Sequence, residues 1–219
     1  MLRHFEPQTE ILPPAQREIW PQLAPSSALS FVLYGGIAVA LHLGHRRSID
    51  FDFFSAEALD KRRMANAFDF MRDAKTTQES PDTLVVAAKT SSDPVKISFF
   101  GSVGIGHVNE PLRTSDDVLL LASLEDLLAT KLKTILDRAE AKDYIDIAAM
   151  LAAGLSLERG LGAFSAMFKS DPALSMRALG YFKDGDLPTL PESEQKILRA
   201  ARDRVATIPK ISLRPGLLS

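Results

Sequence analysis

The sequence predicts an α+β protein with a mixed β-sheet, organised as an α/β lobe over residues 1–122 and a helical lobe over residues 123–219. Short runs rich in β-branched and aromatic residues alternate with turn residues up to Phe100, which is typical of strands. From Ser123 onward, apolar residues recur at helical spacing instead. We therefore expect a sheet followed by a helical bundle, with a cleft between the two lobes.

Local patterns predict the elements of the first lobe in chain order. Residues 1–30 contain five prolines around one helical candidate, 15–23, and predict a packed N-terminal arm. Apolar spacing and turn residues then predict a strand over 31–34, a helix over 36–43, a strand over 47–54, a helix over 56–73, and strands over 74–79, 83–88 and 95–100. Three glycines after residue 100 indicate an irregular segment.

The second lobe is predicted to consist of consecutive helices. Their expected ranges are 123–138, 141–153, 156–168, 172–180 and 192–206. Ser123 is followed three residues later by Asp126, a spacing that is typical of a helix start.

Asp50 and Asp52 are the candidates for a metal site. In the expected strand over 47–54, Ser48, Asp50 and Asp52 share one face and apolar residues share the other. Two neighbouring carboxylates repel each other, but a hard divalent cation such as Mg²⁺ or Mn²⁺ takes carboxylate oxygens as ligands. The alternatives are an edge strand with a solvated acidic face, and a Ser48 hydroxyl that bonds local backbone rather than a phosphate.

A glycine pair before the acids favours the metal interpretation. Gly35 and Gly36 lie between the expected strand over 31–34 and the following helix. Such a turn lets backbone N–H groups approach a phosphate closely, although a simple turn is the alternative. A phosphate loop followed by an acidic strand indicates chemistry on a nucleoside triphosphate (NTP).

Lys131 and Asp146 are charged residues in apolar surroundings. Lys131 falls near the centre of an apolar helical stripe, and Asp146 lies in a segment that is apolar on nearly every side. A buried charge must be paired or solvated, so each is part of a structural ion pair or lines a cleft. A continuous helix would hold their backbones roughly 22 Å apart. A shared site therefore requires a turn within 138–142, against the high helix propensity of that segment.

These motifs resemble the nucleotidyltransferases of the AbiEii abortive-infection toxin family, in the polymerase-beta-like superfamily. The first similar stretches are Gly35-Gly36-x-Ala38 and Gly44-His45-Arg46-Arg47-Ser48-x-Asp50-x-Asp52. Downstream, Lys131-Leu132-(x)5-Arg138-(x)3-Lys142-Asp143-x-x-Asp146 is similar to the C-terminal signature of the family. The resemblance extends over most of the chain, from about Leu33 onward.

The resemblance implies a polymerase-beta-like core and a metal-dependent transfer of NMP from an NTP to an acceptor. It implies a bacterial toxin of a toxin–antitoxin pair, with RNA such as a tRNA end as acceptor and a cognate antitoxin as partner. The expected catalytic residues are Asp50, Asp52, Lys131 and Asp146, with Asp50 and Asp52 as ligands of Mg²⁺ or Mn²⁺. The expected nucleotide-binding residues are Gly35, Gly36, Ser48, Arg138, Lys142 and Asp143, of which Asp143 is first expected to cap and position its helix.

Two positions depart from the family pattern. Ile37 stands where members often carry Thr, and Ser98 stands where related enzymes often carry a third acid. These departures leave open a nucleotide-binding pseudoenzyme or regulatory protein without transfer activity. A glycosyltransferase is a further alternative, because Asp-x-Asp motifs also bind the metals of sugar nucleotides.

Composition limits the partners and the compartment. A net charge of −2 gives no overall basic field, so any RNA contact needs a local patch. The absence of cysteine excludes disulfides and cysteine metal sites. The sequence contains no run of eighteen apolar residues and no signal-like N-terminus, so we expect a cytoplasmic protein without a membrane partner.

Overall fold

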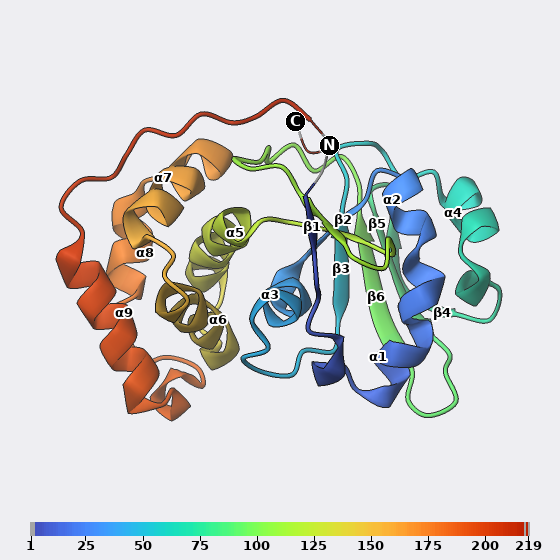
Figure 1. Cartoon of the computed structure of the whole chain (residues 1–219), viewed down its shortest axis with the longest axis horizontal. Coiled ribbons are helices and arrows are strands. Elements are labelled where there is room, and N and C mark those ends of the chain that lie inside the picture. The colour runs from blue at the N-terminus through green and yellow to red at the C-terminus, as the bar shows by residue number, and fades with distance from the viewer. Residues whose placement is uncertain (1–2, 217, 219) are drawn as a thin grey trace. The chain divides into compact units, whose positions relative to one another are not determined.

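The computed structural model describes residues 3–216 and 218, and the chain forms two compact units (Figure 1). The chain passes from the first unit to the second between Ala122 and Ser123. Two short pieces lie in the other unit than their neighbours in the sequence. His107–Asn109 belongs to the second unit, and the described residues from Pro215 onward belong to the first.

A mixed eight-stranded sheet forms the centre of the first unit, as the α+β prediction requires. Its order among the described residues is β1-β7-β8-β2-β3-β6-β5-β4. The strands are β1 (His4–Phe5), β2 (Val32–Tyr34), β3 (Phe51–Phe54), β4 (Lys75–Ser80), β5 (Thr83–Ala88), β6 (Val95–Phe100), β7 (Leu112–Thr114) and β8 (Leu120–Leu121). Strand β2 pairs antiparallel with β3, and β3 pairs parallel with β6. Strand β3 is therefore hydrogen-bonded to a neighbouring strand on both sides.

Helices cover both faces of this sheet, with α3 on one side and α1 and α2 on the other (Figure 1). The helical segments of the unit are η1 (Thr9–Ile11), α1 (Pro14–Ile19), η2 (Trp20–Leu23), α2 (Pro25–Ala28), α3 (Gly35–Leu43), α4 (Lys61–Ala67) and η3 (Asp69–Arg72). The aromatic core lies on one face of the central strands. Phe53 is fully buried and stacks on Phe99, and Trp20 contacts Phe51. Burial of these rings stabilises the strand that carries the acids.

The predicted ranges of two elements in this unit are wrong. The helix expected over 56–73 is the shorter α4 followed by η3, because Asp60 caps α4 by accepting a hydrogen bond from the Arg63 N–H at 2.9 Å. Phe68 then adopts an extended backbone and buries its ring against Phe99. The strand expected over 47–54 begins only at Phe51. The short strands β1, β7 and β8 were not expected at all.

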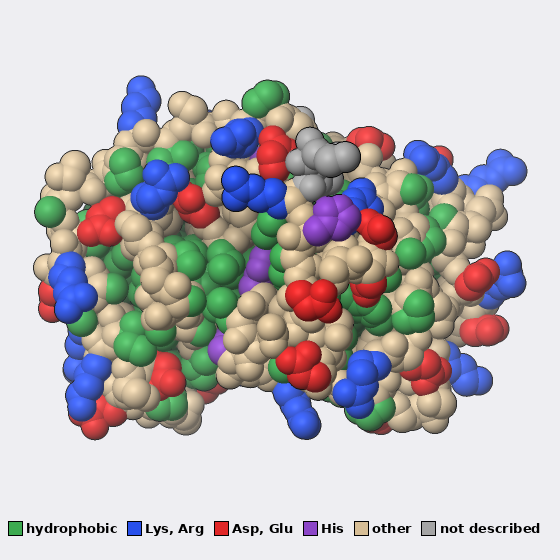
Figure 2. Space-filling view, in the orientation of Figure 1, with side chains coloured by type: hydrophobic (Ala, Val, Ile, Leu, Met, Phe, Trp, Pro, Cys, Tyr) green, Lys and Arg blue, Asp and Glu red, His purple; other side chains and the backbone are tan. Residues whose placement is uncertain are grey.

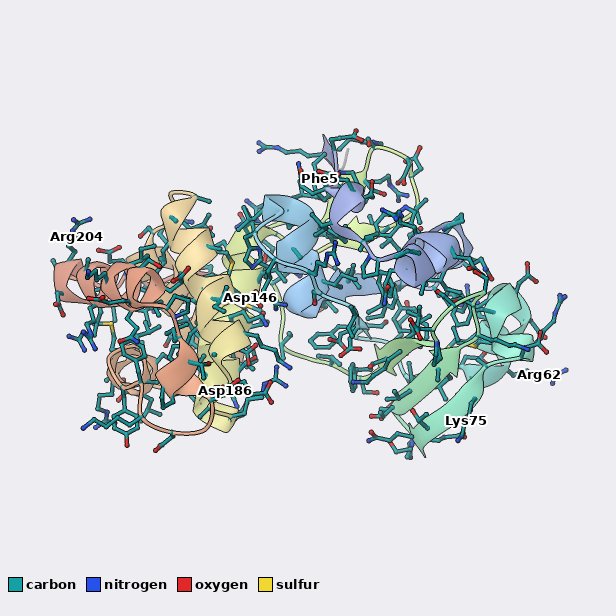
Figure 3. The ribbon with its side chains drawn as sticks, turned by 90° about the horizontal axis from the view of Figure 1, so that it is seen from below. Phe5, Arg62, Lys75, Asp146, Asp186 and Arg204 are labelled. Atoms are coloured by element: carbon teal, nitrogen blue, oxygen red, sulfur yellow. The ribbon has the colours of Figure 1, made fainter. Side chains whose placement is uncertain are left out.

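The second unit is helical. Its elements are α5 (Leu124–Asp137), α6 (Ala141–Ala152), α7 (Leu157–Phe168), α8 (Pro172–Ala178), η4 (Leu187–Thr189) and α9 (Glu192–Arg204). Helix α5 packs closely on α7 at Gly160, where a Cβ would lie 2.5 Å from a methyl carbon of Leu128. Ser123 caps α5 by accepting a hydrogen bond from the Asp126 N–H, as its spacing predicts. Asp186 accepts a bond from the N–H of Ala141 at the start of α6 (Figure 3).

The expected turn between the first two helices of this unit is present. Arg138 and Glu140 have extended backbone, and the chain reverses between Asp137 and Ala141. Tertiary packing therefore overrides the local helix propensity here.

The surface is charged and of mixed sign. In the face shown in Figure 2, Lys and Arg side chains are interspersed with Asp and Glu, in keeping with the small net charge. Within the described residues, none of the helices combines the length and apolar character that crossing a bilayer requires.

Candidate functional site

The turn from β2 into α3 places a glycine directly against Asp52. Gly35 has a φ of +76°, and a Cβ at this position would lie 2.6 Å from Oδ2 of Asp52. Tyr34, the last residue of β2, is the register partner of Asp52 in β3. The carboxylate therefore lies against the first turn of α3, where Gly36 follows and backbone N–H groups have no partner within the helix. Only glycine permits both this backbone conformation and this close approach.

The face of β3 that carries Asp52 continues onto β6. Asp52 is the register partner of Ser98, whose side chain is buried. Asp50 directly precedes β3, and its Oδ2 lies 3.7 Å from Nζ of Lys96. Because side chains alternate along a strand, Lys96 and Ser98 share one face of β6. The position of the expected third acid is therefore a serine, with a lysine two residues before it.

Lys96 is a member of this face that the sequence analysis missed. The sequence contains the information that places Lys96 on this face, because a residue two positions before Ser98 must point to the same side of the strand.

Ser48 does not lie on the acid-bearing strand. It is half-buried in the irregular segment before β3, so strand alternation does not extend back to it from Asp52. The backbone of this segment is anchored from α1, where Nε2 of the buried Gln16 donates a hydrogen bond to the carbonyl of Ile49 at 3.0 Å. This bond holds the residue that precedes Asp50.

The donor set on this face suits a cation that also binds substrate. No group of three or more His, Cys, Asp or Glu side chains in the described part of the chain is arranged to hold a metal ion. Mg²⁺ in nucleotide sites commonly uses only one or two carboxylates and takes its remaining ligands from phosphate and water. Asp50 and Asp52 match that pattern, and they do not match a closed site made of protein ligands alone.

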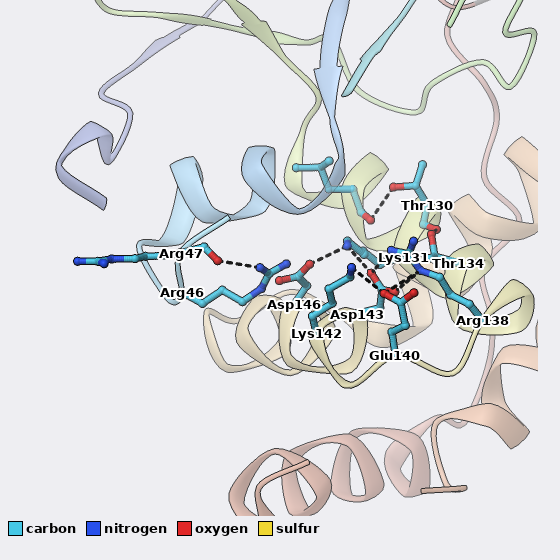
Figure 4. A network of polar contacts seen from close by, with 11 residues as sticks. Arg46, Arg47, Thr130, Lys131, Thr134, Arg138, Glu140, Lys142, Asp143 and Asp146 are labelled. Carbon is cyan, nitrogen blue, oxygen red and sulfur yellow. Dashed lines mark hydrogen bonds and ion pairs between the residues drawn. The ribbon is translucent and has the colours of Figure 1, made fainter. Parts of the chain in front are cut away.

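A second charged cluster lies inside the helical unit. Nζ of Lys131 lies 2.6 Å from Oδ1 of Asp143 and 2.7 Å from Oδ2 of Asp146. Lys131 is 5% exposed and both acids are fully buried. Figure 4 shows the lysine of α5 between the two acids of α6. The turn before Ala141 makes this contact possible, since a straight helix would have separated Lys131 from Asp146.

Arg138 extends the cluster toward solvent. Its Nε donates to Oδ2 of Asp143 at 2.8 Å and its second nitrogen donates to Oδ1 at 3.2 Å. Burial alone would raise the pKa of Asp143, but the hydrogen bonds from Arg138 and the charge of Lys131 outweigh it and hold that pKa below its ordinary value. The four residues form a neutral set of two cations and two carboxylates. Lys142, by contrast, is exposed and pairs with Glu140 at 2.7 Å.

The expected site residues thus form two groups, each within one unit. Gly35, Gly36, Asp50 and Asp52 lie in the first unit, and Lys131, Arg138, Asp143 and Asp146 lie in the second. Asp143 is the residue whose importance the sequence underestimates, because it joins both cations instead of only occupying the first turn of α6. A single site shared by both groups stays a prediction.

Comparisons with known proteins give a family and a fold. The family model described as "Nucleotidyl transferase AbiEii toxin, Type IV TA system" matches residues 23–210. An uncharacterized protein of Aquifex aeolicus (strain VF5), aq_aa25, is 29% identical over 119 residues, which are 53% of this chain and 55% of that protein. The match therefore spans about half the length of this relative.

A solved structure has a similar fold. MenT4, a nucleotidyltransferase toxin from Mycobacterium tuberculosis H37Rv, superposes with a TM-score of 0.54. The superposition covers 84% of this chain and 81% of MenT4, at 14% sequence identity. This likeness concerns the fold alone, and it agrees with the α+β architecture with a mixed sheet that the sequence predicts.

Proposed function

Because the chain belongs to the AbiEii nucleotidyl transferase toxin family, assigned to type IV toxin–antitoxin systems, we propose that it transfers an NMP unit from an NTP to an acceptor. The observation that carries the proposal is the contact of Asp52 with Gly35 at the first turn of α3, beside Asp50. The Asp52 carboxylate therefore lies near the N-terminus of α3, whose backbone N–H groups can bind phosphate. The proposed acceptor is RNA, such as a tRNA end, and the proposed setting is the bacterial cytoplasm with a cognate antitoxin.

The first unit would bind the triphosphate and a divalent cation. Backbone N–H groups of Gly35 and Gly36 would donate hydrogen bonds to phosphate oxygens, and the carboxylates of Asp50 and Asp52 would hold Mg²⁺ or Mn²⁺. When bound, the cation supplies positive charge that neutralises the triphosphate. In the transfer, an acceptor hydroxyl oxygen forms a bond to the α-phosphorus while the bond from that phosphorus to the bridging oxygen breaks; pyrophosphate leaves, and the hydroxyl proton is released to solvent.

The helical unit would supply cations to the same nucleotide. We assign Asp143 and Asp146 a positioning role, because they hold the ammonium of Lys131 in one place inside the unit. Arg138, whose side chain is 44% exposed, is the proposed phosphate-contacting group, Lys131 would contribute its charge from within the cluster, and the exposed Lys142 would take part through its flexible stem. Ser48 is proposed as an additional hydroxyl donor to phosphate.

Label transfer tests the proposal directly. The protein is incubated with each α-³²P-labelled NTP, Mg²⁺ and total RNA, and both labelled RNA and released pyrophosphate are measured. We expect transfer with at least one NTP and none with Asp50→Asn. Asp50 is 43% exposed and its pair with Lys96 is open to solvent, so Asp50→Asn should change the free energy of unfolding by less than ~1 kcal/mol.

The matched control is Asp73→Asn, which removes one exposed acid of the same unit away from β3. It should retain wild-type transfer. Equal activity of Asp50→Asn and the wild type would contradict the proposed site, whereas a large loss of stability in Asp50→Asn would identify the residue as structural.

A nucleotide-binding protein without transfer activity is the second candidate function. The buried Ser98 opposite Asp52 favours it, because the neighbouring strand offers no third carboxylate. In this case the wild type would bind an NTP with Mg²⁺, and neither labelled RNA nor pyrophosphate would form.

A further inference from the structure

Lys96 lies on the acid-bearing face and is assigned no role by the motifs of the family signature. In the parallel pair of β3 and β6, Phe51 is the partner of Ile97 and Asp52 is the partner of Ser98. One step back along both strands, Asp50 is therefore opposite Lys96. The ion pair between them, 3.7 Å from Nζ to Oδ2, is consistent with this register.

The contact between Lys96 and Asp50 is weak enough to be exchanged. The two side chains are 55% and 43% exposed, and the distance is near the outer limit of an ion pair. Pairs of this kind contribute about 0–1 kcal/mol to stability. Lys96 is thus not needed to hold β6 in place, since Ile97 and Phe99 on the opposite face are fully buried and fix the strand.

The charges on this face indicate what Lys96 would contact. A divalent cation held by Asp50 and Asp52 would attract the Asp50 carboxylate more strongly than a single ammonium does. It would also repel that ammonium. A triphosphate that shares the cation brings several negative oxygens to the same face, and a lysine ammonium is a flexible point charge suited to bind them.

We propose that Lys96 is a nucleotide-binding residue whose ammonium leaves Asp50 and binds the triphosphate when cation and NTP occupy the site. The inference rests on the proposed function. It adds a cation from the same sheet as the acids, two residues before Ser98, the position at which the family pattern leads one to expect a third metal ligand.

The experiment separates nucleotide binding from metal binding. Lys96→Met keeps the side-chain length and removes the charge, and Lys96→Arg keeps the charge. Mn²⁺ binding without nucleotide is measured by electron paramagnetic resonance. Binding of ATP, GTP, CTP and UTP in the presence of Mn²⁺ is measured by calorimetry, and the KM values for the NTP and for RNA come from the label-transfer assay.

Lys96→Met should weaken binding of the preferred NTP by about tenfold or more, as expected for the loss of a hydrogen bond to a charged group. Its affinity for Mn²⁺ alone should be unchanged or up to a few fold higher, because a competing cation has been removed. Lys96→Arg should stay within about threefold of the wild type for the NTP, and the KM for RNA should not change in either variant. The control is Lys75→Met on β4, an exposed lysine of the same sheet (Figure 3), which should bind like the wild type.

Each contrary result has a separate meaning. Wild-type affinity of Lys96→Met for the NTP overturns the inference and leaves the proposed function intact. Weaker Mn²⁺ binding by Lys96→Met without nucleotide also overturns it, because Lys96 would then act by positioning Asp50. An increased KM for RNA alone would assign Lys96 to the acceptor. A wild-type protein that binds none of the four NTPs overturns the proposed function itself.

Discussion

Lys131 is the cation at the centre of a buried charged cluster in the helical unit. Its ammonium is enclosed by two fully buried carboxylates, and Arg138 neutralises the remaining charge from the solvent side. Removing one partner of such a cluster leaves an uncompensated charge in a medium that solvates it poorly. The cluster is therefore structural whether or not it also serves a nucleotide.

Replacement of Lys131 should be strongly destabilising. We expect Lys131→Met to lower the free energy of unfolding by about 3–5 kcal/mol, since Asp143 and Asp146 would remain buried without their shared cation. Lys133→Met is the control, because Lys133 lies in the same helix and its pair with Asp137 is open to solvent. Its effect should be below about 1 kcal/mol. Urea unfolding followed by circular dichroism measures both, and similar midpoints for the two variants would contradict the prediction.

The sequence predicts much of this cluster at the level of single residues. Lys131 is conspicuous because it interrupts an apolar stripe, and Asp146 because its surroundings are apolar. The role of Asp143 could not be found in this way, since an acid in the first turn of a helix is common for electrostatic reasons alone. Its contacts with Lys131 and Arg138 depend on the angle between two helices, which no local pattern records.

At the scale of elements, the turn from β2 into α3 is the most constrained part of the candidate site. Gly35 combines a left-handed backbone with contact to Asp52. These two demands act together, because any side chain at this position would both strain the backbone and push the carboxylate away.

Gly35→Ala should therefore change both stability and binding. We expect a loss of at least ~1 kcal/mol in the free energy of unfolding from the positive φ, and a loss of NTP binding from displacement of Asp52. Gly104→Ala is the control, because a Cβ at Gly104 would meet no atom within 4 Å. Calorimetry with the NTPs and urea unfolding give the two readouts. Wild-type binding by Gly35→Ala would show that the close approach has no functional role.

Prediction of elements succeeds where a pattern is long and fails where it is short. The strands β5 and β6 have the predicted limits, and helices α5 to α7 differ from their predicted ranges by no more than one residue at either end. Strands of two or three residues, such as β7 and β8, carry too few alternations to be recognised. The end of α4 depends on burial of Phe68 against another part of the sheet, which local spacing cannot indicate.

At the scale of the molecule, each unit contains a piece of chain from outside its main sequence range. In the helical unit, the buried Asp126 of α5 accepts hydrogen bonds from the N–H of Val108 at 2.6 Å and of Asn109 at 3.3 Å. Burial raises the pKa of Asp126 even though these bonds and the Ser123 hydroxyl favour its charged form. The carboxylate therefore needs its hydrogen-bond donors. Two of these donors lie in the segment His107–Asn109, more than a dozen residues before the helical unit continues at Ser123.

A fragment cut at the apparent lobe boundary should be impaired. We expect a fragment of residues 123–219 to be less stable than a fragment of residues 107–219 by ~2 kcal/mol or more, because only the longer one retains donors for Asp126. Urea unfolding of the two fragments, followed by circular dichroism, tests this. Equal stability would mean that water replaces the lost donors at Asp126.

The chain also returns to the first unit at its other end. The N–H of Gly106 donates to the carbonyl of Leu218 at 2.7 Å, so a residue near the middle of the sequence is bonded to one that is synthesised 112 residues later (218 − 106). At a ribosomal rate of about 5–20 residues per second, the stretch from Ser123 to Leu218 takes on the order of ten seconds to synthesise. During that interval the nascent sheet lacks this contact, so the first unit is completed only after the helical unit has been synthesised.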